Sequence, residues 1–411
     1  MNENIKLPDG WKWVKLAEVI EDIADGGTPS RDNPEYFNGN INWLVIDDIQ
    51  RKILKTKETI TEKGLKHSNA KLWKKGTVIL SFGATIGEVG IAEIELATKQ
   101  GIAGIVPQRD KLMNVFLYYA LKHKKHILLR YANQTTIMEV RPNVIKEKFA
   151  FPLPPLPEQH KIAEILETID NAIEKTDAII EKYKRIKQGL MQDLLTKGID
   201  ENWQIRDEKT HKFKDSPLRR IPEEWEVVRL GEILKYEQPQ KYIVMTEEYD
   251  EKSGVPVLTV GKTFILGYVN EDKGVCNDLP IILFDDFTTD SRFVDFPFKV
   301  KSSATKILRA KDESIDLFYV YNAMKLIRLK PGSEHKRFWI SEYSKILIPL
   351  PALPEQRRIA EILSQIDETI EKEQAYKEKL EGIKKGLMED LLTGKVRVNH
   401  LIEEETKDEI G

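Results

Sequence analysis

Two adjacent pairs of acidic residues are the side chains best suited by type to chemistry, since paired carboxylates can bind a metal ion or exchange protons. They are Asp47–Asp48 and Asp285–Asp286. Neither pair has a third metal ligand nearby in sequence, so we expect surface turns rather than a catalytic or metal centre. Cys276 is the single cysteine, and a lone cysteine is predicted to be inert packing rather than a nucleophile.

The segment Asn33-Pro34-Glu35-Tyr36 is similar to a base-holding motif of adenine amino-methyltransferases, Asn/Asp-Pro-Pro-aromatic. The third position is glutamate here, and no glycine-rich cofactor motif precedes it, so we predict a turn. The phosphate-binding motifs GxxxxGK[ST] and GxGxxG and the zinc-binding motif HExxH are also missing from the sequence. We therefore expect no catalytic residue, no metal and no cofactor on this chain.

The sequence contains two internal repeats, which are the segments that must position any functional residues. Residues 156–196 and 353–393 share 26 of 41 positions at a constant offset of 197. A shorter echo, PDGWKWVKL at 8–16 and PEEWEVVRL at 222–230, precedes each block at an offset of 214. Internal repeats decide the fold before any local motif does. The chain is thus two copies of one unit, a variable head followed by a near-constant stem.

Both stems are predicted to be long helices, because apolar residues recur at steps of three and four. Pro157 and Pro354 suit a first helical turn, and Gly198 and Gly394 suit a C-terminal cap. A long helix with one apolar stripe needs a partner. We expect the stems to form an imperfect antiparallel coiled coil with pseudo-twofold symmetry. The residues predicted to pack are Ile162, Leu166, Ile169, Ile173, Ile180, Ile359, Leu363, Ile366, Ile370 and Leu380. We expect the stripe containing Ile169 and Ile173 to meet the stripe containing Ile366 and Ile370.

The fold class predicted for the whole chain is α+β, with two mixed, β-rich heads. Strands are expected at 76–81, 88–92 and 101–106, then a helix at 112–130; the second head repeats this order at 281–284, 296–300, 305–309 and 315–329. The predicted domains are the first head (1–152), the first stem (153–198), the second head (199–350, with a linker at 199–220), the second stem (351–396) and an acidic tail (397–411).

Composition places few limits on the partner. The formal net charge is −3, which is low for a protein that grips DNA by itself through phosphates. Residues 1–150 carry 23 basic against 18 acidic side chains, whereas residues 215–350 carry 20 against 22. No apolar run approaches the length of a membrane span. The single cysteine fits a reducing compartment, so we expect a cytoplasmic protein.

Several segments together resemble one known family. LPEQ followed by IAEIL, a long helix and GLMxDLLT is similar to the repeated regions of type I restriction–modification specificity (S) subunits. The segments 26–30, 33–44, 83–87 and 98–101 resemble that family's target recognition domains, and 283–295 resembles a second subtype. The resemblance covers almost the whole chain.

That resemblance implies a non-catalytic subunit. Each head would read one half of a bipartite, asymmetric double-stranded DNA site, and the stems would set the distance between the halves. Two methyltransferase (M) subunits would dock and modify adenines, and two restriction (R) subunits can join to cleave unmodified DNA. The methyl donor, nucleotide and magnesium would then be bound by the partners.

Candidate DNA contacts are polar loops, because Lys and Arg bind phosphates while Arg, Asn, Gln and Thr read base edges. An ordinary solvated loop is the alternative for each. In the first head they are Thr28, Ser30, Thr85, Lys99, Gln100, Arg130, Tyr131, Asn133, Gln134 and Thr135. In the second head they are Thr288, Thr289, Arg292, Ser302, Ser303, Thr305, Lys306, Lys336 and Arg337.

Two other classes of protein compete with this interpretation. A non-catalytic coiled-coil scaffold whose two heads bind proteins would have the same repeats, although dissimilar heads argue against it. A nuclease that used the aspartate pairs would cleave DNA by itself with magnesium.

Overall fold

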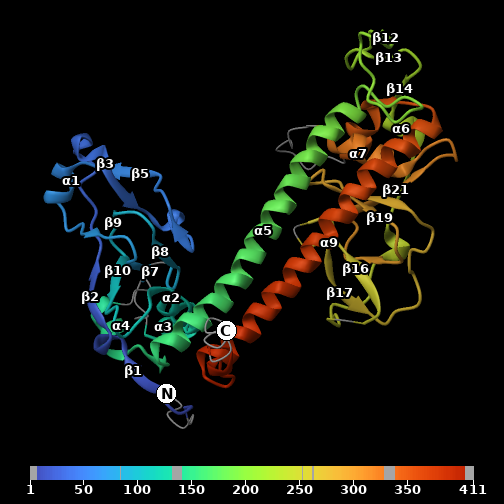
Figure 1. Cartoon of the computed structure of the whole chain (residues 1–411). Helices are drawn as coiled ribbons and strands as arrows, with labels where there is room; N and C mark the ends of the chain where they lie inside the picture. The colour runs from blue at the N-terminus through green and yellow to red at the C-terminus, as the bar shows by residue number, and fades with distance from the viewer. Residues whose placement is uncertain are drawn as a thin grey trace, which may run out of the picture. The chain divides into compact units, whose positions relative to one another are not determined.

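The chain folds as two compact units, and each unit joins segments that are distant in sequence (Figure 1). Unit 1 comprises Met1–Asp177 with Ala375–Gly411, and unit 2 comprises Ala178–Gln374. Because the division falls within both stems, each unit contains one head, the first half of one stem and the second half of the other. The computed structural model describes residues 7–83, 85–131, 141–251, 253–261, 263–327 and 338–402.

Each stem is a continuous helix, as its periodicity predicts. Helix α5 spans Leu156–Leu194, 39 residues, and α9 spans Leu353–Leu392, 40 residues. Glu158 and Glu355 occupy the first turns. Gly198 and Gly394, shortly after the helices, have φ of +68° and +75°, the left-handed conformation that glycine adopts at low cost where a helix ends.

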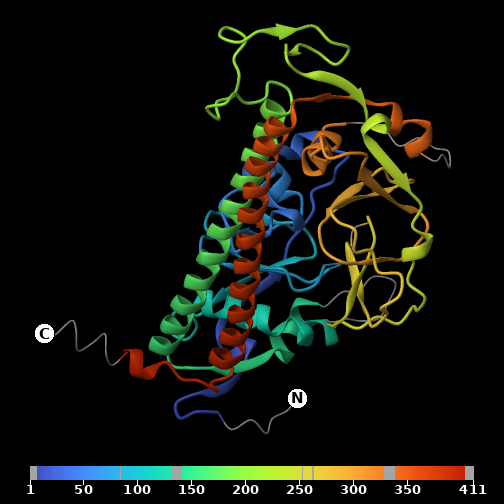
Figure 2. The ribbon, with the colours of Figure 1, turned by 90° about the vertical axis from the view of Figure 1, so that its right-hand side faces the viewer.

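Within each unit the two stem halves pair antiparallel, and Figures 1 and 2 show α5 and α9 side by side. In unit 1, Lys384 bonds Asp170 at 2.5 Å and Lys377 bonds Asp177 at 2.7 Å. In unit 2, Lys187 bonds Asp367 at 2.5 Å. Asp170 and Asp367 are equivalent in the repeat, as are Lys187 and Lys384, so one ion pair recurs in both units.

The ion pairs also fix the register of the stripes. They place Ile169 and Ile173 beside the second half of α9, and Ile366 and Ile370 beside the second half of α5. The expected direct meeting of these two isoleucine pairs was therefore wrong, because antiparallel helices bring first halves against second halves. Seven of the predicted packing residues are buried: Ile162, Leu166, Ile180, Ile359, Leu363, Ile370 and Leu380. Ile169, Ile173 and Ile366 are half-buried.

Among the described residues, each head builds two main sheets. The first head has the order β2 (Ile20–Asp25), β10 (Ile102–Pro107), β7 (Val78–Ser81), β8 (Val89–Ala92), β4 (Lys52–Ile53), and the order β5 (Glu58–Ile60), β3 (Phe37–Leu44), β9 (Leu96–Thr98), β6 (Leu72–Trp73). The second head has β15 (Leu234–Glu237), β21 (Thr305–Ala310), β18 (Ile281–Asp285), β19 (Ser291–Val294), and β17 (Ile265–Val269), β16 (Val255–Leu258), β20 (Lys299–Val300).

The two heads share one topology despite their different sequences. The order β2-β10-β7-β8 corresponds to β15-β21-β18-β19, and β5-β3-β9 corresponds to β17-β16-β20. The central strand of the smaller sheet has one antiparallel and one parallel neighbour in both heads. The first head adds β4, β6 and the short helix α1 (Glu62–Lys66).

Each head closes where its two end strands pair. Strand β1 (Lys12–Lys15) pairs antiparallel with β11 (Ala150–Leu153), and β14 (Glu226–Arg229) pairs in the same way with β22 (Leu347–Leu350). The linker contributes a small hairpin, β12 (Phe213–Lys214) and β13 (Ile221–Pro222). The proline-rich segments that precede the stems, 151–157 and 348–354, thus begin in the last strand of a head and pass directly into a stem.

The helices of the heads differ from the prediction. The single helix expected at 112–130 is two helices, α2 (Asn114–His123) and α3 (Lys125–Arg130), which meet at Lys124 with φ −97° and ψ 22°. The helix expected at 315–329 is α7 (Leu317–Lys325). The remaining short helices are α4 (Pro142–Lys148), α6 (Leu230–Ile233) and α8 (Phe338–Ser341). Helix α2 joins the core of unit 1, and α7 joins that of unit 2.

The residues first considered for catalysis make local packing and hydrogen-bond contacts. Asn33–Tyr36 forms the predicted turn, with the Tyr36 N–H donating to the Asn33 carbonyl at 3.0 Å. Cys276 is fully buried in an apolar cluster of the second head. Asp48 is buried rather than at the surface, because its Oδ2 accepts the Lys57 N–H at 3.2 Å. In the described part of the chain, no helix is long and apolar enough to span a membrane.

Candidate nucleic-acid interface

Three of the loops predicted to contact DNA lie together in the first head. The Gly26 N–H donates to the Ile102 carbonyl at 3.0 Å, and the Gly27 N–H donates to the Thr98 carbonyl at 2.9 Å. The Gly83 N–H reaches the Gly101 carbonyl at 3.3 Å. The loop after β2 (26–30), the described part of the β7–β8 turn (83 and 85–87) and the β9–β10 turn (99–101) are therefore neighbours, and we call them the first loop cluster.

Two buried tryptophans connect the first loop cluster to the core of the head by hydrogen bonds. The Trp43 indole N–H donates to the Gly27 carbonyl at 3.1 Å, and that of Trp73 donates to the Thr98 hydroxyl at 3.1 Å. Both rings are almost fully buried. The cluster thus rests on the core of the head, which is the support that a recognition loop needs to keep its geometry.

Polar side chains of the first loop cluster project from this support. Thr28, Ser30, Thr85, Lys99 and Gln100 are all exposed, as is Arg130 at the end of α3, while Tyr131 is half-buried. Asn133, Gln134 and Thr135 lie outside the described residues. Beside the β7–β8 turn, a hydrogen bond from Lys125 lowers the pKa of Glu88. This carboxylate therefore stays charged and remains paired with Lys125.

Glycine is required where the backbones of the first loop cluster approach one another. A Cβ on Gly26 would lie 2.2 Å from the Thr98 carbonyl oxygen, whereas a Cβ on Gly189, in α5, would meet no atom within 4 Å. Gly26→Ala is expected to lower the free energy of unfolding by about 1–3 kcal/mol, since backbone must shift. The matched Gly189→Ala should raise it by roughly 0.5–1 kcal/mol. Urea unfolding of the full-length variants checks both; equal effects would contradict the close packing of these loops.

The second head brings together the equivalent turns. The Asp286 N–H donates to the Ala304 carbonyl at 3.3 Å, which joins the β18–β19 turn (286–290) to the β20–β21 turn (301–304). These two turns form the second loop cluster. They correspond by topology to the β7–β8 and β9–β10 turns of the first head. Polar residues predicted from two dissimilar sequences therefore fall on the same two turns of one fold.

The predicted residues of the second loop cluster differ in exposure. Thr288, Ser302 and Ser303 are exposed, and Thr289 and Arg292 are half-buried. Thr305 and Lys306 are buried, and the Lys306 ammonium donates to Gln238 at 3.2 Å, so this amine already has an acceptor. Lys336 and Arg337 lie outside the described residues. A surface turn was expected at Asp285–Asp286, but Asp286 is buried, and its carboxylate accepts the Trp339 backbone N–H at 2.9 Å.

Sequence reasoning missed one segment of the second head. The loop after β15, beginning at Gln238, corresponds by topology to Gly26–Ser30, and Lys241 within it bonds Glu237 at 2.6 Å. Its sequence has no similarity to the glycine-rich loop of the first head. Only its position after the first strand of the larger sheet identifies it as the counterpart of that loop.

The joint between head and stem was also missed, although its residues lie in the repeated segments. In the first joint, Glu158 accepts the Trp11 indole N–H at 3.2 Å and binds Arg397 through both carboxylate oxygens. In the second joint, Glu355 does the same with Trp225 at 3.0 Å and with Arg206. Repetition of a tryptophan before each head and a glutamate after it was the available signal.

The neighbouring glutamines complete the joints. Gln159 accepts the Met113 N–H at 2.9 Å, and Gln356 accepts the Asp316 N–H at 2.8 Å. The start of each stem is thereby tied to the residue that precedes α2 or α7. In LPEQ, then, the glutamate fixes the stem to the tryptophan just before the first strand of the head, and the glutamine fixes it to the residue just before the head's helix.

The first head has an additional brace on its stem. Arg51 donates to both oxygens of Glu174, at 2.8 and 2.9 Å, and to Asn171 at 2.6 Å. Lys52 lies 3.3 Å from Glu167. These contacts join the start of β4 to the middle of α5, so the first head is held at two places along its stem.

Two copies of a head-and-stem module, each with polar turns gathered on a rigid head, define a bivalent recognition protein. A family model described as the type I restriction modification DNA specificity domain matches this chain twice, over residues 8–184 and 222–382. The chain belongs to that family.

Similar proteins agree with this assignment. The type I restriction enzyme MjaVIII specificity subunit of Methanocaldococcus jannaschii is 29% identical, over 97% of this chain and 95% of that protein. The EcoR124I/EcoR124II specificity subunit of Escherichia coli is 44% identical over 164 residues, which are 39% of this chain and 40% of that one. The crystal structure of the type I restriction–modification S subunit from M. genitalium superimposes with a TM-score of 0.62 at 18% identity, covering 95% of this chain and 98% of that one, which shows the shared fold.

Proposed function

We propose that this chain is the DNA specificity subunit of a type I restriction–modification complex. The first loop cluster would read one half of a bipartite double-stranded DNA site, and the second loop cluster would read the other half. The observation that carries the proposal is that one topology presents two different sets of polar side chains on equivalent turns. Equivalent placement supports a shared task, and different side chains support different targets. A protein-binding scaffold has no comparable support.

The proposal assigns no catalysis to this chain. Within the described residues, no group of three or more His, Cys, Asp or Glu side chains could hold a metal ion. Methyl donor, nucleotide and magnesium would belong to two methyltransferase subunits and, where present, two restriction subunits. The joints and stems would supply the rigid frame on which these partners place their active sites over the DNA.

Reconstitution tests the proposed role. The purified chain with methyl donor and DNA is expected to leave DNA unmethylated, and addition of the methyltransferase subunit should produce adenine methylation at one bipartite sequence. Replacing residues 17–150 with the head of another family member should change one half of that sequence only. Sequencing of methylated adenines reads both results. Methyl transfer by the chain alone, or a change in both half-sites, would contradict the proposal.

A single substitution tests one base contact within the same assay. Gln100 is exposed on the β9–β10 turn, and a bidentate amide contact to a base is worth roughly 1–3 kcal/mol of discrimination. Gln100→Ala is therefore expected to relax one position of one half-site, while Gln365→Ala, on the exposed face of α9, serves as the control.

A further inference from the structure

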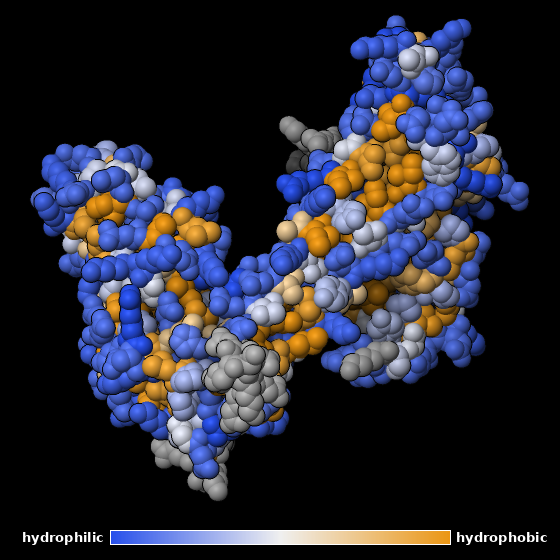
Figure 3. All heavy atoms as spheres, in the orientation of Figure 1, coloured by the Kyte–Doolittle hydropathy of each residue, from blue (hydrophilic) through white to orange (hydrophobic). Residues whose placement is uncertain are grey.

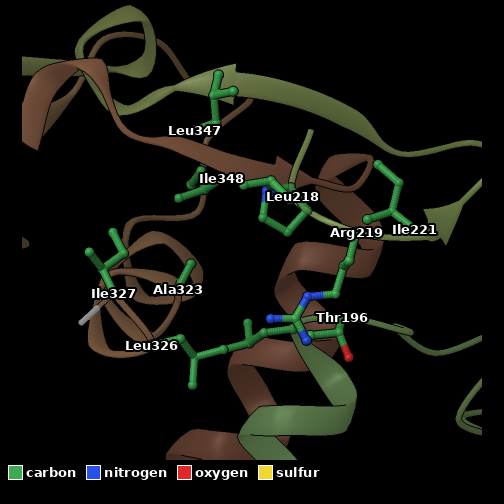
Figure 4. A pocket seen from close by; sticks show the side chains of 11 residues that line it. Thr196, Leu218, Arg219, Ile221, Ala323, Leu326, Ile327, Leu347 and Ile348 are labelled. Atoms are coloured by element: carbon green, nitrogen blue, oxygen red, sulfur yellow. The ribbon is translucent and has the colours of Figure 1, made fainter. Parts of the chain in front are cut away.

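Unit 2 contains a groove beside its joint, where the second half of α5 meets α7. One end is a small apolar pocket of about 140 Å³. Leu195 directly after α5, Ile348 of β22 and, after α7, Leu326 and Ile327 contribute to its walls, and Figure 4 shows Arg219 of the linker extending across it toward Thr196. Figure 3 shows apolar side chains gathered on the surface over this part of unit 2. The pocket has room for one aliphatic side chain.

The apolar pocket opens beside a larger, cationic groove of about 730 Å³, and the two share Arg219 and Leu326. Lys184, Lys187 and Lys325 also line the groove, and its single lining carboxylate, Asp367, is already paired with Lys187. Burial lowers the pKa of Lys325, as do the charges of Arg292 and Lys187. Lys184 is paired as well, with Glu181 at 2.8 Å, but four cations line the groove against one lining carboxylate, and this excess of positive charge favours an anionic ligand.

A buried acceptor on the wall of the groove lacks a donor. Asn322 of α7 is fully buried, and its Nδ2 donates to the Phe318 carbonyl at 2.8 Å. Its Oδ1 has no hydrogen-bond partner among the described residues. Buried polar atoms in native proteins are nearly always satisfied, so a ligand with an N–H or O–H group is expected next to Asn322.

The equivalent place in unit 1 is closed. Helices α2 and α7 can be aligned on Met113 and Asp316, whose backbone N–H groups donate to Gln159 and Gln356. In this alignment Tyr119 is the counterpart of Asn322. The Tyr119 hydroxyl donates to Asp170 at 2.7 Å, and Asp170 is paired with Lys384. His123 and Lys124 take the places of Leu326 and Ile327. The first joint therefore fills with its own side chains what the second leaves open.

We propose that this groove binds a peptide segment of the methyltransferase subunit, in which an apolar side chain is followed by acidic residues. The inference rests on the proposed function, which supplies that partner. The apolar residue would fill the pocket below Arg219, the carboxylates would meet Lys184, Lys325 and Arg219, and a backbone N–H would donate to Asn322. A protein segment fits better than nucleic acid, because a phosphodiester chain has no group for the apolar pocket. Because unit 1 is closed, one such segment binds per chain.

Charge reversal on α5 tests the electrostatic part. Lys184→Glu is expected to weaken binding of the purified methyltransferase subunit to the full chain roughly tenfold, measured by titration calorimetry. The matched control is Lys182→Glu, an exposed lysine two residues away on α5 that does not line the groove; it should change binding less than about twofold. Lys122→Glu, at the α2 position equivalent to Lys325, should behave like the control. Equal effects of all three substitutions would overturn the proposal.

Site-specific photocrosslinking identifies the occupant. A photoreactive residue in place of Leu326 should capture one acidic peptide of the methyltransferase subunit in the purified complex with DNA, and the same residue in place of His123 should not capture that peptide. Capture of DNA, or of residues 403–411 from a second copy of this chain, would overturn the proposal. Failure of the unaltered chain to bind the methyltransferase subunit at all would instead refute the proposed function, so the two failures are distinguishable.

Discussion

Glu355→Ala is expected to destabilise unit 2 more than any other single substitution at a joint. The Glu355 carboxylate is buried and accepts the Trp225 indole N–H and the Ile199 backbone N–H, both at 3.0 Å, besides binding Arg206 through both oxygens. Alanine would leave a buried guanidinium and two N–H donors without acceptors. Breaking such a buried pair costs about 3–5 kcal/mol, which is a large part of the stability of a typical domain.

The equivalent residue of the first joint is the matched control. Glu158 accepts from Trp11 and Arg397, but no backbone N–H to it corresponds to that of Ile199 among the described residues, and the Arg397 side chain is 30% exposed against 11% for Arg206. Glu158→Ala should therefore cost less than Glu355→Ala. Hydrogen exchange of the full-length variants locates each loss in its own unit. A larger effect at Glu158 would show that the burial of the paired arginine does not decide how much each glutamate stabilises its unit.

The stems were predictable because their signals are local and repeated. A period of three to four apolar residues, a proline at the start and a glycine after the end placed both helices nearly to the residue, since each signal acts within a turn or two of helix. What could not be read was the register of their pairing. Lys187 and Asp170 appear as interruptions of an apolar stripe, and only the antiparallel partner supplies Asp367 and Lys384 to neutralise them.

The heads were predictable only in part. The strands at β7, β8, β10, β18 and β21 are apolar runs bounded by turns, and the sequence indicated them. The strand expected at 296–300 is shorter than predicted, because only Lys299–Val300 pairs as β20. Strands β4 and β9 have two and three residues, too few for any periodicity, and their pairing depends on tertiary contacts. The sequence predicted the same order of elements in both heads, but the strand pairing that defines their shared topology was hidden for the same reason.

The loop clusters show that the predicted polar residues lie on neighbouring turns but differ in exposure. Lys99 and Gln100 follow a buried strand and are exposed, whereas Lys306 is the second residue of a buried strand and donates to Gln238. Both are polar residues at a turn, and only the sheet decides which side of the turn faces solvent. Asp286 illustrates the same limit, since its burial depends on Trp339, which is distant in sequence.

Lengthening both stems by seven residues is expected to lengthen the recognised DNA spacer while leaving both half-site sequences unchanged. The insertions belong after Asp177 in α5 and after Gln374 in α9, because the two units divide there and each stem half then keeps its own partner. Seven residues are close to two helical turns, so the apolar stripe stays on one face. They add ~10.5 Å, which is about three base pairs at ~3.4 Å each. Sequencing of methylated adenines measures the spacer.

The insertion in α5 alone is the informative control. It would shift one helix by seven residues against the other and break either the Lys187–Asp367 or the Lys384–Asp170 pair, together with the apolar contacts around it. We therefore expect the single insertion to abolish or strongly reduce methylation, and the double insertion to retain it. A double-insertion protein that is folded and active on the original spacer would show that the docked partners, rather than the stems, set the distance between the half-sites.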